Sequence, residues 1–404
     1  MMLRVAFRNV LRQRRRSLLT VLTMFGGFAL AAVSIGLSDG TYNNVIELFT
    51  RNQLGHVQIH APGYLDRPSL YKNIADYEEV GSRVDAVPGV QHWAPRIKAA
   101  GLASVNDKTT GVSIIGIDPA HENETTRFDR KITEGRSLGQ TAAREVVLGS
   151  GLARVLRADV GEELVVLSQG ADGSIANDLY TIVGLAESNS GIQDQTTMYL
   201  HVVDAQELFV LEDRVHEIAI VVETLEDVPL VTAAIDEALA GRDVVVEPWQ
   251  VFAKAFYRAM VLDQQGTWIM LGIIILLVAV GVLNTVLMTV LERRREYGVL
   301  RAIGTGPGQI FRLVLIEVTV LAVIGIVAGS LTAWAANHYF AVRGFSAGYE
   351  FTYGGIEFTR MYTEVNARTF WIPALSVMVS ALLVSIYPAA RAAHTPPAQA
   401  MRLH

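Results

Sequence analysis

The sequence contains no cysteine and only five lysines in 404 residues. Without cysteine, disulfide bonds, thiolate zinc sites and thiol catalysis are excluded, and a folded domain has to be stabilised by its core. No lysine follows a glycine, so the Gly-Lys-Ser/Thr of a phosphate-binding P-loop is absent. The lysines are Lys72, Lys98, Lys108, Lys131 and Lys254. The chain therefore cannot bind ATP in the P-loop manner.

Sites for metals and nucleic acids are not indicated either. The sequence has no His-Glu-x-x-His zinc motif. His56 and His60 are four residues apart, which in a strand separates them by about 13 Å, too far to share a metal ion. The formal net charge of -6 argues against a nucleic-acid partner, whose phosphates need a clustered basic surface. We expect no catalytic residue, no metal and no directly bound cofactor.

Apolar residues make up 51% of the chain, and many of them lie in four long runs. A helix rises about 1.5 Å per residue, so about 20 apolar residues cross about 30 Å of hydrocarbon. The runs that meet this length are 18–37, 267–291, 311–336 and 370–390. A mixed sequence, residues 38–266, separates the first two. These features predict an α+β membrane protein with four transmembrane helices and a large mixed α/β domain between the first and second.

The first run has a second interpretation as an export signal. Arg14-Arg15-Arg16-Ser17 precedes it, and the small residues of 29–32 resemble a cleavage region. The apolar part of a signal peptide spans about 7 to 15 residues, whereas this run continues for about 20 residues to Asp39. Its length therefore favours a membrane anchor that is retained.

Arginine predicts the orientation, because basic residues in short flanks resist translocation. Arginines are concentrated in residues 1–17, 292–310 and 391–404, which four spans place on one side of the membrane. We therefore expect an inner (plasma) membrane protein with both termini in the cytoplasm and with 38–266 and 337–369 outside it.

The first 17 residues combine an apolar stripe with an arginine face at helical spacing. This pattern is typical of an amphipathic helix that lies on the cytoplasmic leaflet and contacts membrane lipids. A disordered basic tail is the alternative, but it would not need the apolar stripe.

In 38–266, segments rich in Val, Ile and Thr predict strands, and periodic apolar segments predict helices. The predicted strands are 57–60, 110–117, 164–167, 180–185, 197–200, 216–222 and 244–246. The predicted helices are 149–156, 204–209 and 226–240. We expect flexible loops at 170–176 and 187–195. Residues 251–263 are expected to continue as a helix into the second span.

Two polar residues within the spans, Glu317 and Asn284, are candidates for function. A carboxylate in lipid is costly and marks a functional site by default. Alternatively, Glu317 lies close enough to the cytoplasmic surface to pair with Arg312 or Arg294. A proton-driven carrier would want more than one buried acid, so ion coupling is disfavoured.

Residues 284–305 read NTVLMTVLERRREYGVLRAIGT, which predicts a helix leaving the membrane, a charged stretch and a short amphipathic helix ended by glycine. Tyr297, Leu300 and Ile303 form its apolar set. Such a helix can be a docking surface, although arginine content alone would also suit an ordinary cytoplasmic loop. The order of residues resembles the signature of the FtsX-like permease family.

Other segments carry the same resemblance. Residues 6–20 look like the family's N-terminal elbow, residues 387–402 look like its C-terminal tail, and Glu317 falls where the family often has an acid. Residues 116–119 and 146–161 are similar to the periplasmic core domain of MacB and LolC/LolE proteins. The family's usual Ala-Ser after the glycine is replaced by Thr305-Gly306-Pro307-Gly308, which leaves the shape of this turn open.

The resemblance implies the permease subunit of a type VII ABC transporter. Two permease copies or paralogues would dimerise, and a separate cytoplasmic ATPase would bind ATP and Mg²⁺ and dock on the cytoplasmic loops. Its closure would pass through the second helix to the outer domain, a mechanism called mechanotransmission. By resemblance, the residues on or beside the docking segment are Glu292, Arg293, Arg294, Glu296, Gly298, Arg301, Ala302 and Gly304.

The resemblance covers three branches of the family. LolC/LolE-like subunits release lipoproteins from the inner membrane, MacB-like proteins expel drugs or peptides with a periplasmic adaptor, and FtsX-like proteins regulate cell-wall hydrolases. MacB usually carries a fused ATPase domain, and FtsX has a smaller outer domain, so the lipoprotein branch is expected, with a periplasmic chaperone as a further partner. A sensor or regulatory subunit is the alternative outside transport.

Overall fold

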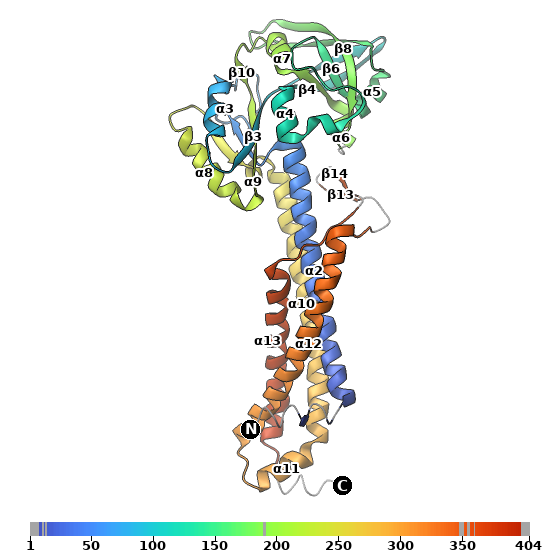
Figure 1. Ribbon diagram of the computed structural model, residues 1–404, viewed down its shortest axis with the longest axis vertical. Coiled ribbons are helices and arrows are strands. Elements are labelled where there is room, and N and C mark those ends of the chain that lie inside the picture. Colours follow the sequence, from blue (N-terminus) through green and yellow to red (C-terminus); the bar gives the residue numbers. More distant parts are fainter. Residues whose placement is uncertain are drawn as a thin grey trace. The chain divides into compact units, whose positions relative to one another are not determined.

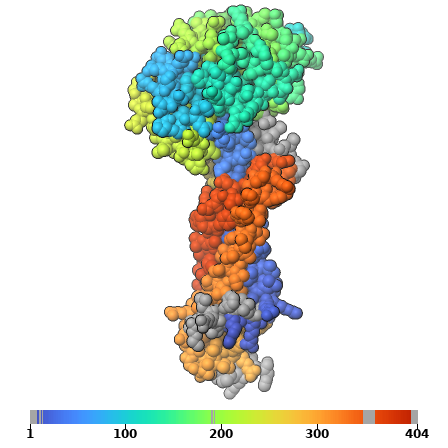
Figure 2. Space-filling model, in the orientation of Figure 1, coloured from blue at the N-terminus to red at the C-terminus, as the bar shows by residue number. Residues whose placement is uncertain are grey.

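The computed structural model describes residues 8, 9, 12, 14–188, 191–346, 351–353, 356–358 and 360–396. The chain forms two compact units, which we name the helical unit and the α/β unit. The helical unit comprises 1–43, 260–348 and 360–404, and the α/β unit comprises 44–259 and 349–359. Figure 1 labels their elements, and Figure 2 shows the residues of each unit by colour along the sequence. Most of the expected N-terminal helix (1–17) and the end of the C-terminal tail (397–404) lie outside the described residues.

Among the described residues, the helical unit contains five helices whose bounds are given below, and two of them, α2 and α10, extend past its boundary along the chain. The helices are α2 (Arg14–Phe49), α10 (Lys254–Glu292), α11 (Arg294–Ala302), α12 (Pro307–Arg343) and α13 (Ala367–Ala393). Within the described residues, four are long and apolar enough to cross a bilayer, and each includes one of the predicted runs. α10 begins at Lys254, which confirms the expected continuation of the helix into the second span from that residue onward.

Valines at every fourth position of α10 form its buried stripe: Val278, Val282, Val286 and Val290. Four-residue spacing places these side chains on one face of the helix, where they join buried residues of α2, α12 and α13. Asn284 lies off this stripe and is exposed in the single chain. The interior of the helical unit is thus made mainly of valine, alanine and other small or medium apolar side chains.

Glycines allow α2 to pack closely against α12. A Cβ atom built at Gly325 would lie 2.9 Å from the Met24 Cβ, and one at Gly329 would lie 2.8 Å from the Phe28 ring. Real side chains do not tolerate such distances without a shift of the neighbour. The Gly-x-x-x-Gly spacing of α12 therefore provides a flat contact face of the kind that brings membrane helices together.

One end of the helical unit carries side-chain hydrogen bonds between helices. Asn366 donates to Asp39 over 2.9 Å, and the Ser38 and Thr267 hydroxyls lie 3.3 Å apart. Asn337 is fully buried in α12 and donates from Nδ2 to the Ala32 carbonyl oxygen over 3.3 Å. These bonds join α2 to α10, α12 and the segment before α13.

The α/β unit is built on one ten-stranded sheet with the order β12-β1-β11-β3-β4-β9-β6-β8-β5, in which β7 also pairs with β3 and β8. All its strand pairs are antiparallel except β4 with β9 and β6 with β8. The strands are β1 (Val57–His60), β3 (Val90–Val105), β4 (Lys108–Ile117), β5 (Ile132–Gly135), β6 (Glu145–Gly149), β7 (Glu163–Gln169), β8 (Ile175–Ala186), β9 (Thr197–His201), β11 (Glu217–Val222) and β12 (Val245–Pro248).

Short helices and two small sheets complete the α/β unit (Figure 1). The helices are α3 (Tyr77–Asp85), α4 (Pro119–Thr126), α5 (Ser150–Leu156), α6 (Gly191–Thr196), α7 (Val202–Phe209), α8 (Val228–Ala238) and α9 (Trp249–Phe252). This unit also contains the π-helical turn η1 (Thr50–Leu54) and the 3-10 turns η2 (Phe128–Lys131) and η3 (Leu225–Asp227). The small sheets pair β2 (Ile74–Ala75) with β10 (Arg214–Val215) and β13 (Phe351–Tyr353) with β14 (Ile356–Phe358).

The seven predicted strands are confirmed as β1, β4, β7, β8, β9, β11 and β12, and the three predicted helices as α5, α7 and α8. The expected loop at 187–195 is wrong in its second part, where α6 begins at Gly191. Asp194 stabilises this short helix, because its carboxylate accepts bonds from the Ser188 amide (2.9 Å) and hydroxyl (2.5 Å). In the segment 170–176, β8 already begins at Ile175.

Replacing Gly325 by valine tests the close contact of α2 with α12. We expect Gly325→Val to lower the free energy of unfolding by about 2 kcal/mol, the usual range for overpacking a tight interface. Thermal unfolding in lipid nanodiscs measures the change. Gly272→Val is the matched control, because a Cβ atom at Gly272 meets nothing within 4 Å. Equal stability of the two variants would contradict the proposed packing role.

Candidate functional site

The candidate site lies where α10 ends and the chain turns into α11. Arg293 leaves helical geometry with φ -87° and ψ 11°, although its amide still donates to the Thr289 carbonyl over 3.1 Å. α11 then begins at Arg294 and ends at Ala302. Gly304 follows with φ 101°, a left-handed conformation that favours glycine, and Pro307 starts α12. The sequence therefore places a nine-residue helix between two long ones.

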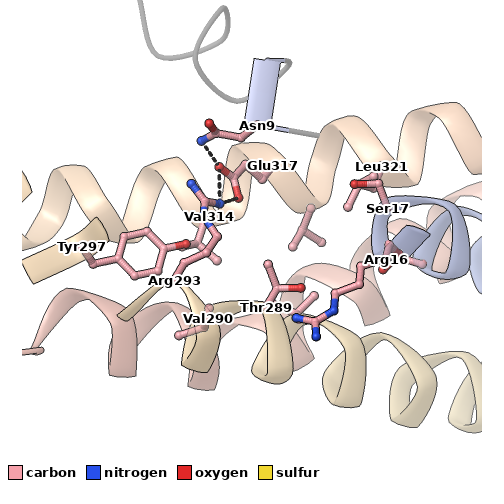
Figure 3. Close-up of a pocket in the computed structure, with 13 residues that line it drawn as sticks. Asn9, Arg16, Ser17, Thr289, Val290, Arg293, Tyr297, Val314, Glu317 and Leu321 are labelled. Carbon is pink, nitrogen blue, oxygen red and sulfur yellow. Dashed lines mark hydrogen bonds and ion pairs between the residues drawn. The ribbon is translucent and has the colours of Figure 1, made fainter. Parts of the chain in front are cut away.

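A buried ion pair joins this turn to α12. The Arg293 Nη1 lies 2.8 Å and 3.0 Å from the two carboxylate oxygens of Glu317, and the two residues are only 7% and 8% exposed. Asn9 also donates to Glu317 Oε1 over 2.6 Å (Figure 3). Charge-assisted bonds of this kind compensate for removing both groups from water only when they are complete.

The partner of Glu317 differs from the predicted one. The alternative interpretation of Glu317 predicts an ion pair with Arg312 or Arg294, but the paired residue is Arg293. Arg312 lies five positions before Glu317 on the same helix, where side chains do not face each other. Arg294 is already the first residue of α11. The break at Arg293 is what directs its side chain toward α12.

Tyr297 is the second buried component of the site. Its side chain is fully buried, and the Arg293 guanidinium carbon lies 5.2 Å from the centre of its ring. This distance is typical of a cation–π contact. Burial, together with the Glu317 carboxylate, raises the pKa of the Tyr297 phenol above its ordinary value, so the phenol stays neutral. Of the predicted apolar set, Tyr297 thus faces the interior of the helical unit, whereas Ile303 is exposed.

Further polar contacts surround the ion pair. Arg16 of α2 pairs with Glu292, and Arg293 Nε donates to Glu296 over 2.9 Å. Arg301 donates from Nη1 to the Ala393 carbonyl at the end of α13 over 3.1 Å. The helical unit thus brings the start of α2, the α10–α11 turn, α12 and the end of α13 together.

The cavity beside the ion pair is small. Its volume is about 40 Å³, and side chains that include Thr20, Thr289, Glu317 and Arg16 line it (Figure 3). This volume has room for one or a few waters, whereas sites for small molecules measure roughly 300 to 1,000 Å³. In this conformation the ion pair and its neighbouring side chains connect helices, and the cavity beside them has no space for a substrate.

The outward side of α11 is apolar at Val299 and at Ile303, the residue that directly follows the helix. Val299 is 46% exposed and Ile303 is 75% exposed, and four-residue spacing places them on the same side. Exposed charges, those of Glu292, Arg295 and Glu296, lie in the same segment. Exposed apolar side chains with a polar rim are typical of protein-binding surfaces.

The structure divides the eight residues predicted for the docking segment into three groups. Glu292, Glu296, Ala302 and Gly304 are exposed, Arg294 and Arg301 are half-buried, and Arg293 and Gly298 are buried. The buried pair can shape the segment but cannot contact a partner in this conformation.

Sequence reasoning missed Val299, Asn9 and the buried Asn337. Val299 could have been found from its spacing to Ile303. Asn337 directly follows the predicted span 311–336, which left it outside the search for polar groups in the membrane. Asn9 gave no signal, because its contact depends on how the N-terminal segment meets α12.

Comparison with known proteins gives matches along almost the entire chain. The model of the MacB-like periplasmic core domain matches residues 17–238, and the model of the FtsX-like permease C-terminal region matches residues 268–397. The chain is 23% identical, over 98% of both chains, to a lipoprotein-releasing system transmembrane protein LolC from Neisseria meningitidis.

Two further relatives are an ABC transporter permease and a macrolide export protein. An uncharacterised ABC transporter permease from Methanocaldococcus jannaschii is 23% identical over 98% of this chain and 96% of its own. A macrolide export ATP-binding/permease protein MacB from Aeromonas hydrophila is 24% identical over 80% of this chain and 50% of its own. Together with the four apolar helices, these matches indicate a membrane protein with a periplasmic-type domain.

Removing one partner of the buried ion pair should be costly, because it leaves the other charge buried and unpaired. We expect Arg293→Met to lower the free energy of unfolding by about 3 kcal/mol. The double variant Arg293→Met with Glu317→Leu should recover much of this loss, since it removes both charges. Thermal unfolding in nanodiscs of the single and double variants measures the coupling.

Arg294→Met is the control for the ion pair. Arg294 makes no ion pair among the described residues, so its replacement should change the free energy of unfolding by less than about 0.5 kcal/mol. If Arg293→Met and Arg294→Met have the same effect, the ion pair is not a structural connection.

Proposed function

This chain belongs to the family of ABC transporter permeases that combine a MacB-like periplasmic core domain with an FtsX-like C-terminal region, and we propose that it transmits the movements of an ABC ATPase to its extracytoplasmic domain. The ATPase would be a separate cytoplasmic subunit that binds ATP and Mg²⁺. The permease itself would therefore not be an enzyme.

The observation that carries this proposal is the buried pair of Arg293 and Glu317. α11 offers an outward apolar surface at Val299 and Ile303, and the ion pair fixes the base of this helix to α12. Removing one partner of such a pair by mutation costs about 3 to 5 kcal/mol, and from this strong connection we infer that a force on α11 moves α12 with it. A displacement by a docked ATPase would thus enter the helical unit directly.

We further propose that the end of the helical unit with α11 faces the cytoplasm. Arginines 12, 14, 15 and 16, the arginines of α11 and Arg391 lie in the described parts of the three basic segments. The positive-inside rule favours the cytoplasm for such segments. The α/β unit would then be periplasmic, and a second copy or a paralogue would complete a dimer in the inner membrane.

For the cargo, we propose lipoprotein release of the LolC/LolE type. The LolC relative from Neisseria meningitidis matches this chain over 98% of both lengths, which supports the same domain order. Efflux of drugs or peptides is the second candidate, supported by the MacB relative, of which this chain covers half. A periplasmic chaperone would serve the first function and a periplasmic adaptor the second, while FtsX-like regulation of hydrolases would need no cargo.

The docking surface is tested by placing a charge on the outward face of α11. We expect Ile303→Asp to weaken association with the ATPase at least about 10-fold, because the centre of an apolar interface does not accept an unpaired charge. Co-expression of the permease with a candidate ABC ATPase, followed by affinity purification and quantification of both, gives the result. Leu230→Asp, at a residue 73% exposed on α8, is the matched control. Equal recovery of the ATPase with both variants would exclude this docking surface.

The cargo is tested on the complex in nanodiscs by mass spectrometry of bound lipidated peptides, with and without ATP. Lipoprotein release predicts a triacylated lipoprotein that leaves the complex when ATP is added. A bound adaptor or hydrolase with no lipoprotein would contradict this branch. The absence of any ATPase would contradict the proposed transmission itself.

A further inference from the structure

The α/β unit contains a pocket of about 480 Å³, within the size range of sites for small molecules. Part of its apolar wall is formed by Leu54 at the end of η1, Leu70 in the loop between β1 and β2, and Phe252 of α9. Lys98 and Ala100 of β3 line it as well. The pocket lies entirely within this unit, and it is about twelve times larger than the cavity beside Arg293.

The wall of the pocket is held by internal contacts. Gln58 is 2% exposed and donates to the Leu54 carbonyl oxygen over 2.7 Å, which fixes the end of η1 to β1. Tyr64, another lining residue, stacks between His60 and His216, with ring centres 5.2 Å and 5.8 Å away. These contacts indicate a preformed site that does not have to be opened by a ligand.

Two charged residues line the pocket, Lys98 and Glu217. Lys98 donates from Nζ to Glu217 Oε2 over 2.5 Å, but its side chain remains 32% exposed, whereas that of Glu217 is only 1% exposed. An ammonium has three donors, and this bond uses one of them. The pocket therefore offers a ligand mainly the positive charge of Lys98, because the Glu217 side chain is almost completely covered.

The Glu217 carboxylate has a second cationic partner besides Lys98. Arg96 is buried and donates to Glu217 over 3.2 Å, and it also pairs with the buried Glu122 over 2.6 Å. Burial raises the pKa of the Glu217 carboxyl, but Lys98, His60 and Arg96 lower it more, so the pKa lies well below its usual range. Because Arg96 also stabilises this carboxylate, Lys98 can interact with a second anion.

We propose that this pocket binds a single-chain amphiphile with an anionic head. The apolar chain lies against Leu54, Leu70 and Phe252, and the carboxylate or phosphate head accepts hydrogen bonds from Lys98. A free fatty acid and a lysophospholipid share this chemistry. The proposal concerns the α/β unit alone and does not depend on the cargo or on the ATPase.

Photo-crosslinking of the full chain in nanodiscs of neutral lipid tests the proposal. The probes are a diazirine fatty acid, a diazirine lysophosphatidic acid and the uncharged diazirine fatty alcohol, and mass spectrometry locates the crosslinks. We expect at least one anionic probe to label peptides with Leu54, Leu70 or Phe252 at least five-fold more than the alcohol does. Labelling by only one of the anionic probes would identify the source of the ligand.

Two variants and two controls separate the pocket from the membrane background. Ala100→Trp should fill the pocket and reduce this labelling at least about 10-fold, and Lys98→Met should reduce labelling by the anionic probes only. Thr181→Trp and Lys108→Met, at positions that do not line the pocket, should leave it unchanged. Lys98→Met also removes a partner of the buried Glu217 and can therefore impair folding. If Lys98→Met does not fold, Ala100→Trp still tests the pocket.

Each of the following results would overturn the proposal: labelling of the pocket equally by acid and alcohol, undiminished labelling in a folded Ala100→Trp variant, or no labelling of pocket peptides at all. Preferential crosslinking of a diazirine-labelled peptide at this site would assign the pocket to a different class of ligand and would also contradict it.

Discussion

A carboxylate within an apolar helix must be paired, and the pair of Glu317 with Arg293 determines how the end of the helical unit is built. The arginine can reach α12 only because α10 stops at Glu292 and the chain turns before α11. Tyr297 covers the guanidinium, and Asn9 brings the N-terminal segment to the same carboxylate. Contacts around one buried carboxylate thus connect α10, α11, α12 and the N-terminal segment. Because these contacts fix the inward face of α11, its opposite face points outward.

The same constraint separates what the sequence can predict from what it cannot. Glu317 stands out in any apolar run, because a charge in lipid needs an explanation. Its partner could not be identified from the sequence, because Arg293, Arg294 and Arg295 are neighbours there. Only the break between α10 and α11 gives their side chains different directions. Similarly, β1 and β11 are rich in β-branched residues, whereas the 16-residue β3 contains Pro95, Gly101 and several alanines. Its strand character comes from pairing with β4, β7 and β11, a tertiary effect that local patterns do not show.

The two units have different kinds of interior. The helical unit has valine and glycine contacts and a cavity for only a few waters, which suits the transmission of movement. The α/β unit combines a large sheet with buried ion pairs and a pocket of ligand size. Leu54 of that pocket ends η1, which follows α2 directly in the chain, and Phe252 lies two residues before α10 begins. The segments that follow α2 and precede α10 therefore contribute part of the pocket wall.

The central claim is that α11 and α12 move as one body when the ATPase acts, and the absence of cysteine allows a direct measurement. Spin labels at Arg295→Cys on α11 and Val323→Cys on α12, two exposed positions, report the distance between the two helices by pulsed electron resonance, with and without ATP and vanadate. The account predicts an unchanged distance in the native background and a broadened or shifted one in Glu317→Gln. A distance that changes with nucleotide while the Arg293–Glu317 pair is intact would contradict it.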